Sequence, residues 1–204
     1  MPVVLNHGMW VGYPDVDAPT RLVLPELKFG LEDGEKIPSR IFPQHSYFPF
    51  CAMNYAVKTE AAVTLYQGLQ GRDYPYTRFD DIWAGILFKK IADHLGYAAS
   101  SGRPLVQHQR ASNIWSYYAQ ESAGLVANEQ FWRVVDSCQL RGDTWAGCYR
   151  ELAQWVGSHG GAIDARNESY WRKLEEAMLT WVDLWERPMS TAAIVFLDEG
   201  DEPL

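Results

Sequence analysis

The stretch RFDDIWAGILFKKIADHLGY, Arg78–Tyr97, decides where the chain turns helical. Apolar residues recur in it at helical spacing, and Gly96 follows where such a helix would end. Two adjacent carboxylates, Asp80 and Asp81, stand at its start. Either one of them only caps the helix, or one caps while the other faces a cleft, where it holds a sugar hydroxyl or acts as a base. Arg78 could pair with a carboxylate or a diphosphate.

Elsewhere the chain divides into a front of strands and loops and a helical back. Short strands and turn-rich loops are predicted for residues 2–14, 21–38, 50–57 and 103–109, with a short helix near residue 59. Further helices are predicted around 128–138, after a cap at Asp143 or Thr144, and over 169–185. This pattern indicates an α/β protein with a helical C-terminal part.

Composition excludes several classes of protein. The chain has 204 residues, enough for about one domain, and a net charge of −8 with a pI of about 5.1, which argues against binding of a nucleic-acid backbone. Its 3 cysteines form no CxxC pair, so neither a zinc site nor a disulfide framework is indicated. No signal peptide and no transmembrane segment is predicted, which favours a cytoplasmic protein.

The segment QHQRASN, residues 107–113, offers polar groups at the end of a predicted strand. His108 is either a histidine satisfied within the core or a metal ligand. Arg110, Ser112 and Asn113 could each reach a phosphate.

Two further segments hold polar side chains. Asp15 and Asp17 form an Asp-x-Asp motif, which occurs both in metal sites and in ordinary turns. Cys51 is interpreted as a small buried hydrophobe rather than a nucleophile. Asn54, on a buried strand, needs hydrogen-bond partners and could order a pocket.

Taken in order, five segments resemble one family. NHGMWVGYPDVDAPT, FPFCAMNYAV, RFDDIWAG with ADHLGY, GRPLVQHQRASN and EEAMLTWVDLW resemble the reversibly glycosylated polypeptides, the UDP-arabinopyranose mutases best known from plants. The resemblance spans roughly residues 6–186. It implies the C-terminal portion of a GT-A-like nucleotide-diphosphosugar transferase fold. It also implies a Mn²⁺-dependent (or Mg²⁺-dependent) enzyme that interconverts UDP-arabinopyranose and UDP-arabinofuranose.

The resemblance also assigns roles to residues. Asp80 and Asp81 match an acidic pair on the acceptor side of the cleft and are the predicted catalytic residues. His108 matches a histidine that completes the metal shell. The predicted substrate-binding residues are His7, Trp10, Asp15, Asp17, Asn54, Arg78, Trp83, Arg110, Ser112 and Asn113.

The chain also departs from the family pattern. The Asp-Asp-Asp manganese motif and the uridine-binding strands belong to an N-terminal half that this sequence lacks. Gln107-His108-Gln109-Arg110 replaces an aromatic-His-Ser-Lys sequence. We therefore expect a partial GT-A-like domain over 1–125, a helical cap over 126–190, an acidic tail over 191–204, and no mutase activity from this chain alone.

Two hypotheses for function remain open. In the first, the chain is part of a mutase-like enzyme acting on a UDP-sugar. In the second, it is a non-catalytic binding or assembly subunit in a homo- or hetero-oligomer with family members. The protein is expected in the cytoplasm, and the resemblance implies that it can also bind peripherally to the Golgi surface.

Overall fold

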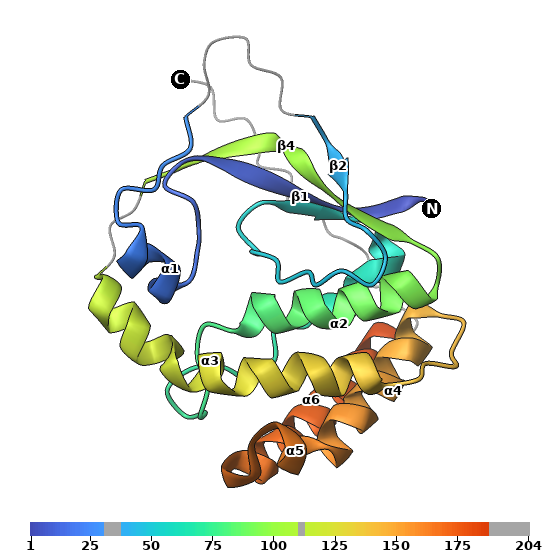
Figure 1. Ribbon diagram of the computed structural model, residues 1–204. Helices are drawn as coiled ribbons and strands as arrows, with labels where there is room; N and C mark the ends of the chain where they lie inside the picture. The colour runs from blue at the N-terminus through green and yellow to red at the C-terminus, as the bar shows by residue number, and fades with distance from the viewer. Residues whose placement is uncertain (31–37, 110–112, 188–204) are drawn as a thin grey trace, which may run out of the picture.

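The computed structural model describes residues 1–30, 38–109 and 113–187 as a mixed α/β fold. The elements in chain order are β1 (Val3–Gly12), α1 (Ala18–Val23), β2 (Arg40–Ile41), β3 (Tyr55–Val57), η1 (Thr59–Leu65), α2 (Asp80–His94), β4 (Ala98–His108), α3 (Ile114–Ser137), α4 (Trp145–Ser158), α5 (Gly160–Asp164), η2 (Ala165–Asn167) and α6 (Glu168–Trp185). Figure 1 shows the sheet lying over α2, with the remaining long helices below it.

The described strands form one mixed sheet in the order β2-β4-β1-β3. β1 runs parallel to β4, with Leu5 opposite Ala99, and antiparallel to β3. β4 starts five residues before the predicted strand at 103, because the small residues from Ala98 to Ser100 pair with the buried half of β1. The parallel pair is connected through α2, as parallel strands require a crossover.

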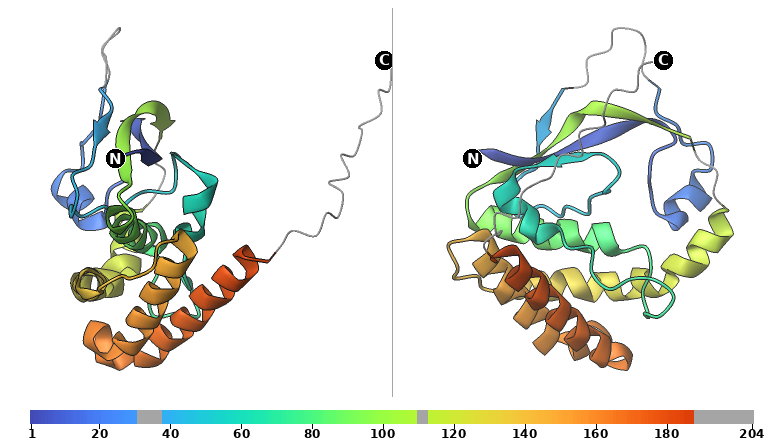
Figure 2. Two further views of the ribbon diagram at one scale, coloured as in Figure 1. Left: turned by 90° about the vertical axis from the view of Figure 1, so that its right-hand side faces the viewer. Right: turned by 180° about the vertical axis from the view of Figure 1, so that it is seen from behind.

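The helices bury a core that is rich in aromatic rings. Trp83 of α2, Phe131 of α3 and Trp171 of α6 lie within 4.8 to 5.8 Å of one another, measured between ring centroids. α2 is buried nearly all round from Trp83 to Lys89, because the sheet side, α3, α4 and η1 all pack on it. The right-hand view of Figure 2, which shows the molecule from behind, places η1 beside α2. The core therefore fixes the position of the first turn of α2.

Most predicted helices are confirmed. α2 and α6 lie within one residue of their predicted starts, and the side chain of Thr144 caps α4. The helix predicted around 128–138 is longer, because α3 already begins at Ile114. The strand predicted at Arg21 is wrong: this segment is α1, which Asp17 caps and which carries a proline in its first turn.

The predicted boundary at residue 125 falls inside α3, a continuous helix. Side chains on both sides of it, including Leu5, Phe88, Leu152 and Trp171, belong to one hydrophobic core. The acidic tail predicted for 191–204 lies outside the described residues. None of the helices in the described ranges combines the length and apolar character needed to cross a membrane.

Candidate functional site

A cleft of about 1010 Å³ opens where the start of α2 faces the segment before α1. In Figure 1 the starts of α1, α2 and α3 lie on the same side of the molecule. Seven of the predicted site residues that the structure describes line this cleft together: His7, Trp10, Asp15, Asp17, Arg78, Asp80 and Asp81. They come from three segments, β1, the stretch before α1 and the start of α2, which the fold brings together.

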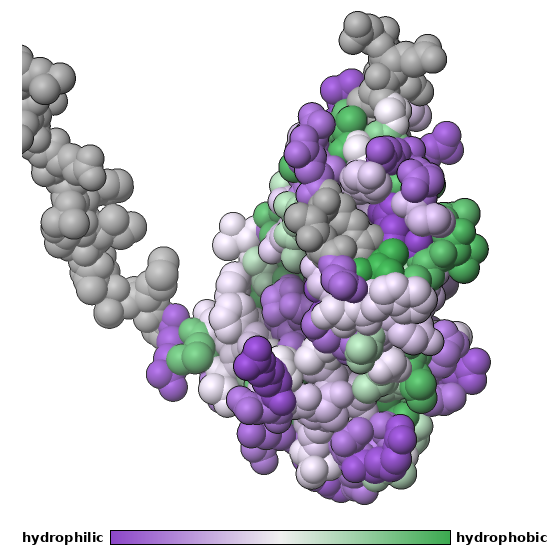
Figure 3. Space-filling view, turned by 90° about the vertical axis from the view of Figure 1, so that its left-hand side faces the viewer, coloured by the Kyte–Doolittle hydropathy of each residue, from purple (hydrophilic) through white to green (hydrophobic). Residues whose placement is uncertain are grey.

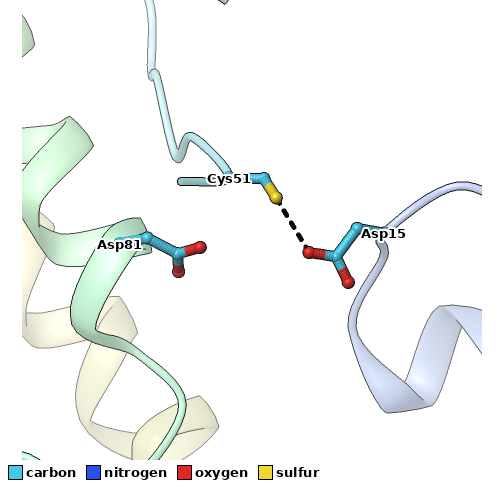
Figure 4. A group of neighbouring side chains, drawn as sticks. All are labelled: Asp15, Cys51 and Asp81. Atoms are coloured by element: carbon cyan, nitrogen blue, oxygen red, sulfur yellow. Dashed lines mark hydrogen bonds between the residues drawn. The ribbon is translucent and has the colours of Figure 1, made fainter. Parts of the chain in front are cut away.

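Asp15, Cys51 and Asp81 form the centre of this cleft (Figure 4). The thiol of Cys51 donates a hydrogen bond to Oδ2 of Asp15 at 2.9 Å. Their ligand atoms, with one carboxylate oxygen of Asp81, all lie within 4.8 Å of one another. Cys51 is thus partnered and half-buried, not the buried hydrophobe that the sequence suggested.

The environment shifts the proton affinity of this group. Burial raises the pKa of the Asp81 carboxyl to about 6, and the negative charges of Asp80 and Asp15 act in the same direction. Burial also raises the pKa of the Cys51 thiol, helped by its hydrogen bond to Asp15. The cleft therefore holds a protonated thiol beside a carboxyl that titrates close to neutral pH, a property typical of proton-transfer sites.

Neither Asp80 nor Asp81 is the N-cap of α2, so the predicted cap is wrong. The cap position belongs to Phe79, which makes no side-chain capping bond. Asp81 instead accepts hydrogen bonds from the backbone N–H groups of Ile82, at 2.8 Å, and Ala52, at 3.0 Å. Asp80 makes no hydrogen bond with any described residue, which leaves its carboxylate available to a ligand. Both charges still stabilise the positive end of the helix.

The Asp-x-Asp pair does not act as a unit. Both carboxylate oxygens of Asp17 accept hydrogen bonds from Thr20, one from the backbone N–H and one from the hydroxyl, each at 2.8 Å. Asp17 therefore holds the start of α1, while Asp15 contacts Cys51 in the cleft.

His7 and Trp10 form the wall of the cleft that β1 supplies. His7 is 7% exposed, and burial lowers the pKa of its imidazole. Its ring lies edge-on to Trp10 at 5.3 Å, and its Nε2 accepts from the backbone N–H of Cys51 at 3.4 Å. Nε1 of Trp10 is buried and has no hydrogen-bond partner among the described residues, so a ligand acceptor could satisfy it.

Arg78 lines the opposite wall, beside Glu121. Its Nε donates to Oε1 of Glu121 at 3.0 Å, and its guanidinium carbon lies 3.7 Å from the centre of the Tyr117 ring. Glu121 is a buried carboxylate that sequence reasoning missed, because nothing in its local pattern separates it from a solvent-facing helix residue. Gln70, Arg72 and Thr77 also line the cleft and were not predicted.

Two predicted residues lie outside the cleft lining, Asn54 and Trp83. The buried strand predicted over 50–57 is wrong, because β3 begins only at Tyr55, after Asn54, and is largely exposed. Nδ2 of Asn54 donates to the carbonyl groups of Pro104, at 3.0 Å, and Met9, at 3.3 Å, and so ties β3 to the parallel pair. Trp83 lies in the aromatic core, where its Nε1 donates to Oδ1 of Asn128 at 3.1 Å. Neither side chain lines the cleft.

His108 and Asn113 also lie apart from the cleft lining. Nδ1 of His108 donates to the carbonyl of Tyr13 at 2.8 Å, and His108 is not part of the metal-capable group described above. Oδ1 of Asn113 accepts from the backbone N–H groups of Trp115 and Ser116 and caps α3. The predicted contacts of Arg110 and Ser112 lie outside the described residues.

Comparison with known proteins decides the family. The model of the family described as reversibly glycosylated polypeptide matches residues 1–190. The chain belongs to this family. It is 36% identical over 191 residues to the probable UDP-arabinopyranose mutase 1 of Pisum sativum, covering 91% of this chain and 50% of that protein.

Other members of the reversibly glycosylated polypeptide family show similar identity and similar coverage. UDP-arabinopyranose mutase 1 of Arabidopsis thaliana is 35% identical over 89% of this chain and 50% of its own length. UDP-arabinopyranose mutase 1 of Oryza sativa subsp. japonica is 34% identical over 93% of this chain and 51% of its own length. The chain thus spans about half the length of the curated relatives it matches.

The described residues do not fit the Mn²⁺ or Mg²⁺ site that the family resemblance implied. Both ions prefer shells built from oxygen, while Asp15, Cys51 and Asp81 offer two carboxylates and one sulfur. His108, the predicted metal ligand, lies outside this group, and its Nδ1 donates to the carbonyl of Tyr13. We assign no chemical step to a metal ion on these residues.

Proposed function

We propose that the cleft binds a UDP-sugar and that the chain is part of a UDP-arabinopyranose mutase, to which Asp80 and Asp81 contribute the acid–base groups. The observation that carries this proposal is the convergence of Asp15, Asp80 and Asp81 with Trp10 in one cleft of a family member. Carboxylates that accept from sugar hydroxyls, beside an aromatic ring, form a setting suited to a sugar.

The chemistry of ring contraction fits this group of side chains. When an arabinopyranose becomes an arabinofuranose, the bond from C1 to O5 breaks, a bond from C1 to O4 forms, and a proton moves from O4 to O5. A carboxyl whose pKa is about 6, as at Asp81, can both accept and return such a proton near neutral pH. Asp80, which has no partner among the described residues, is the candidate to orient a hydroxyl of the sugar.

Calorimetric titration of the chain with UDP-arabinopyranose tests the proposal. We expect binding that Asp80→Asn and Trp10→Ala each weaken by about tenfold. Trp132→Ala is the matched control, because Trp132 lines a different cavity of about 570 Å³ between α2 and α3. Equal affinity in all variants would contradict the proposal, as would loss of binding in the control alone. A parallel assay for furanose product tests our expectation that this chain alone does not turn the sugar over.

A role as an assembly subunit is the second candidate function. Val23 of α1 and Trp115 of α3 are 77% and 68% exposed, and the two helices pack against each other. Figure 3 looks onto the side of the molecule that carries α1 and shows hydrophobic surface there. Such surface is typical of protein contacts. Size-exclusion chromatography tests this role, and a monomer at every concentration would count against it.

A further inference from the structure

Arg78 adopts a backbone conformation that residues with a Cβ rarely occupy. Its φ is +66°, and among the described residues other than glycine only His45, with φ +58°, shares this left-handed region. Such a conformation persists only where the surroundings hold it, and it is common at ligand sites. Arg78 directly precedes Phe79 and the acidic first turn of α2. Its backbone conformation therefore also sets the direction in which this turn enters the cleft.

Two side chains of α3 hold the guanidinium of Arg78. Glu121, whose side chain is 6% exposed, accepts from its Nε at 3.0 Å. The ring of Tyr117, one helical turn earlier, lies 3.7 Å from the guanidinium carbon. The hydroxyl of Thr77 adds a bond to the carbonyl of Gln120 at 2.8 Å. Contacts with α3 therefore hold both the chain next to Arg78, through Thr77, and the guanidinium of Arg78 itself.

Glu121 also links this wall to the opposite one. Its second oxygen, Oε2, accepts from the backbone N–H of Ala18 at 2.8 Å, at the start of α1. Ala18 lies three residues after Asp15, which contacts Cys51 in the cleft. One buried carboxylate thus sets the distance between the cation at Arg78 and the acidic group around Asp15.

Acidic and basic groups share the cleft. Asp15, Asp80 and Asp81 line it together with Arg78, whose side chain is partly exposed. Both Nη groups of Arg78 have no hydrogen-bond partner among the described residues. An arginine held through Nε, with its Nη groups available, is suited to the oxygens of a phosphate.

We propose that Glu121 and Tyr117 are positioning residues that hold Arg78 as the anchor for the diphosphate of the bound sugar nucleotide. This inference rests on the proposed function and deepens it. The diphosphate contacts Arg78, while the sugar hydroxyls face the carboxylates. The ligand class is therefore a glycosyl diphosphate, with its anionic part at Arg78 and its hydroxyl-bearing part at the carboxylates.

Calorimetric titration with inorganic pyrophosphate and with UDP tests the anchor. Arg78→Lys keeps the charge but removes the Nε bond and the planar fork, and we expect it to weaken pyrophosphate binding by about tenfold. Arg172→Lys is the matched control, because Arg172 lies on α6, pairs with Glu168 and does not line the cleft. We expect its affinity to stay within about twofold. Absence of pyrophosphate binding to the wild-type chain, or equal effects of both variants, would overturn the anchor.

Glu121→Asp tests the positioning role at constant charge, because it shortens the side chain by one methylene. We expect about fivefold weaker pyrophosphate binding. We also expect the Nε–Hε nuclear magnetic resonance signal of Arg78 to move toward that of an exposed arginine. Arg78→Lys identifies the signal by its loss. Should Glu121→Asp impair folding, Tyr117→Leu replaces it with the same expectation. Unchanged signal and affinity in a folded variant would refute the positioning role.

The two proposals fail separately. If pyrophosphate binding depends on Arg78 but UDP-arabinopyranose binds no more tightly than UDP, the anchor stands and the sugar-binding function falls. If UDP-arabinopyranose binds in a manner that depends on Asp80 but not on Arg78, the sugar-binding function stands and the anchor falls.

Discussion

Cys51 and Asp15, 36 positions apart in the chain, meet through a hydrogen bond of 2.9 Å from thiol to carboxylate. The contact joins the loop at 49–52 to the segment before α1, and Figure 4 shows the two side chains pointing toward each other. Asp81 lies beside both groups, and its carboxylate binds the next backbone N–H of the same loop, that of Ala52. Three segments thus depend on one small polar group.

The reactivity of Cys51 follows from this contact. Because burial and the hydrogen bond to Asp15 raise the pKa of its thiol, Cys51 in the native chain should react slowly with a disulfide reagent at about pH 8 despite its partial exposure. Asp15→Asn removes a negative charge that disfavours the thiolate, and we expect a several-fold faster reaction. Cys51→Ser identifies the signal. Reaction of the native chain at the rate of an ordinary exposed thiol would contradict the contact.

Asp81 should make stability depend on pH. The pKa of the Asp81 carboxyl is about 6 in the folded chain and about 3.8 for an aspartate in an unfolded chain, so the folded state binds the extra proton between these two pH values. Stability due to Asp81 is therefore present at low pH and is lost as pH rises from about 4 to about 6. The effect is on the order of 2 kcal/mol, after allowance for solvent screening in an open cleft.

Denaturant unfolding at several pH values tests this dependence. In Asp81→Asn the loss of stability between about pH 4 and pH 6 should disappear. The free energy of unfolding of the variant should therefore increase relative to that of the wild type as the pH rises. Asp80→Asn should reduce the loss only in part, because it removes one of the negative charges that raise the pKa of Asp81. A parallel pH profile for wild type and Asp81→Asn would contradict the buried position of this carboxyl.

Gly124 of α3 should tolerate no side chain. A Cβ there would overlap Cδ2 and Cε2 of Phe79, the residue directly before α2 beside the cleft. Gly124→Ala should therefore cost about 1–3 kcal/mol despite the better helix propensity of alanine. Gly161→Ala, where the nearest atom is 3.7 Å away, should be neutral or stabilising. Similar unfolding free energies for the two variants would refute the close packing of α3 on Phe79.

Helix periodicity made part of this fold predictable. α2 and α6 repeat apolar residues over four turns or more, so their positions follow from the pattern alone. α1 was missed, although Asp17 before Ala-Pro is a recognisable start of a helix. Its apolar run from Leu22 to Leu24 is too short to separate a helix from a strand.

The candidate site was predictable by residue type but not by partner. Trp10, Asp15 and Asp80 were selected from the sequence, and the structure places them in one cleft. Glu121 and Cys51 were not selected, because their roles arise from contacts with residues more than 35 positions away. His108 was selected by resemblance to the family, and its role as a metal ligand stays a prediction; the structure places it at the end of β4, outside the cleft lining.

The central claim is that the cleft lined by Trp10 and Asp81 receives the sugar nucleotide. The most direct test follows the indole N–H signals of the chain by nuclear magnetic resonance during titration with UDP-arabinopyranose, with Trp10→Phe identifying the signal of Trp10. Nε1 of Trp10 is buried without a partner among the described residues, and Nε1 of Trp132 contacts Glu129 beside the other cavity. The account predicts a large shift for Trp10 and none for Trp132. A shift confined to Trp132, or no shift at saturating ligand, would contradict it.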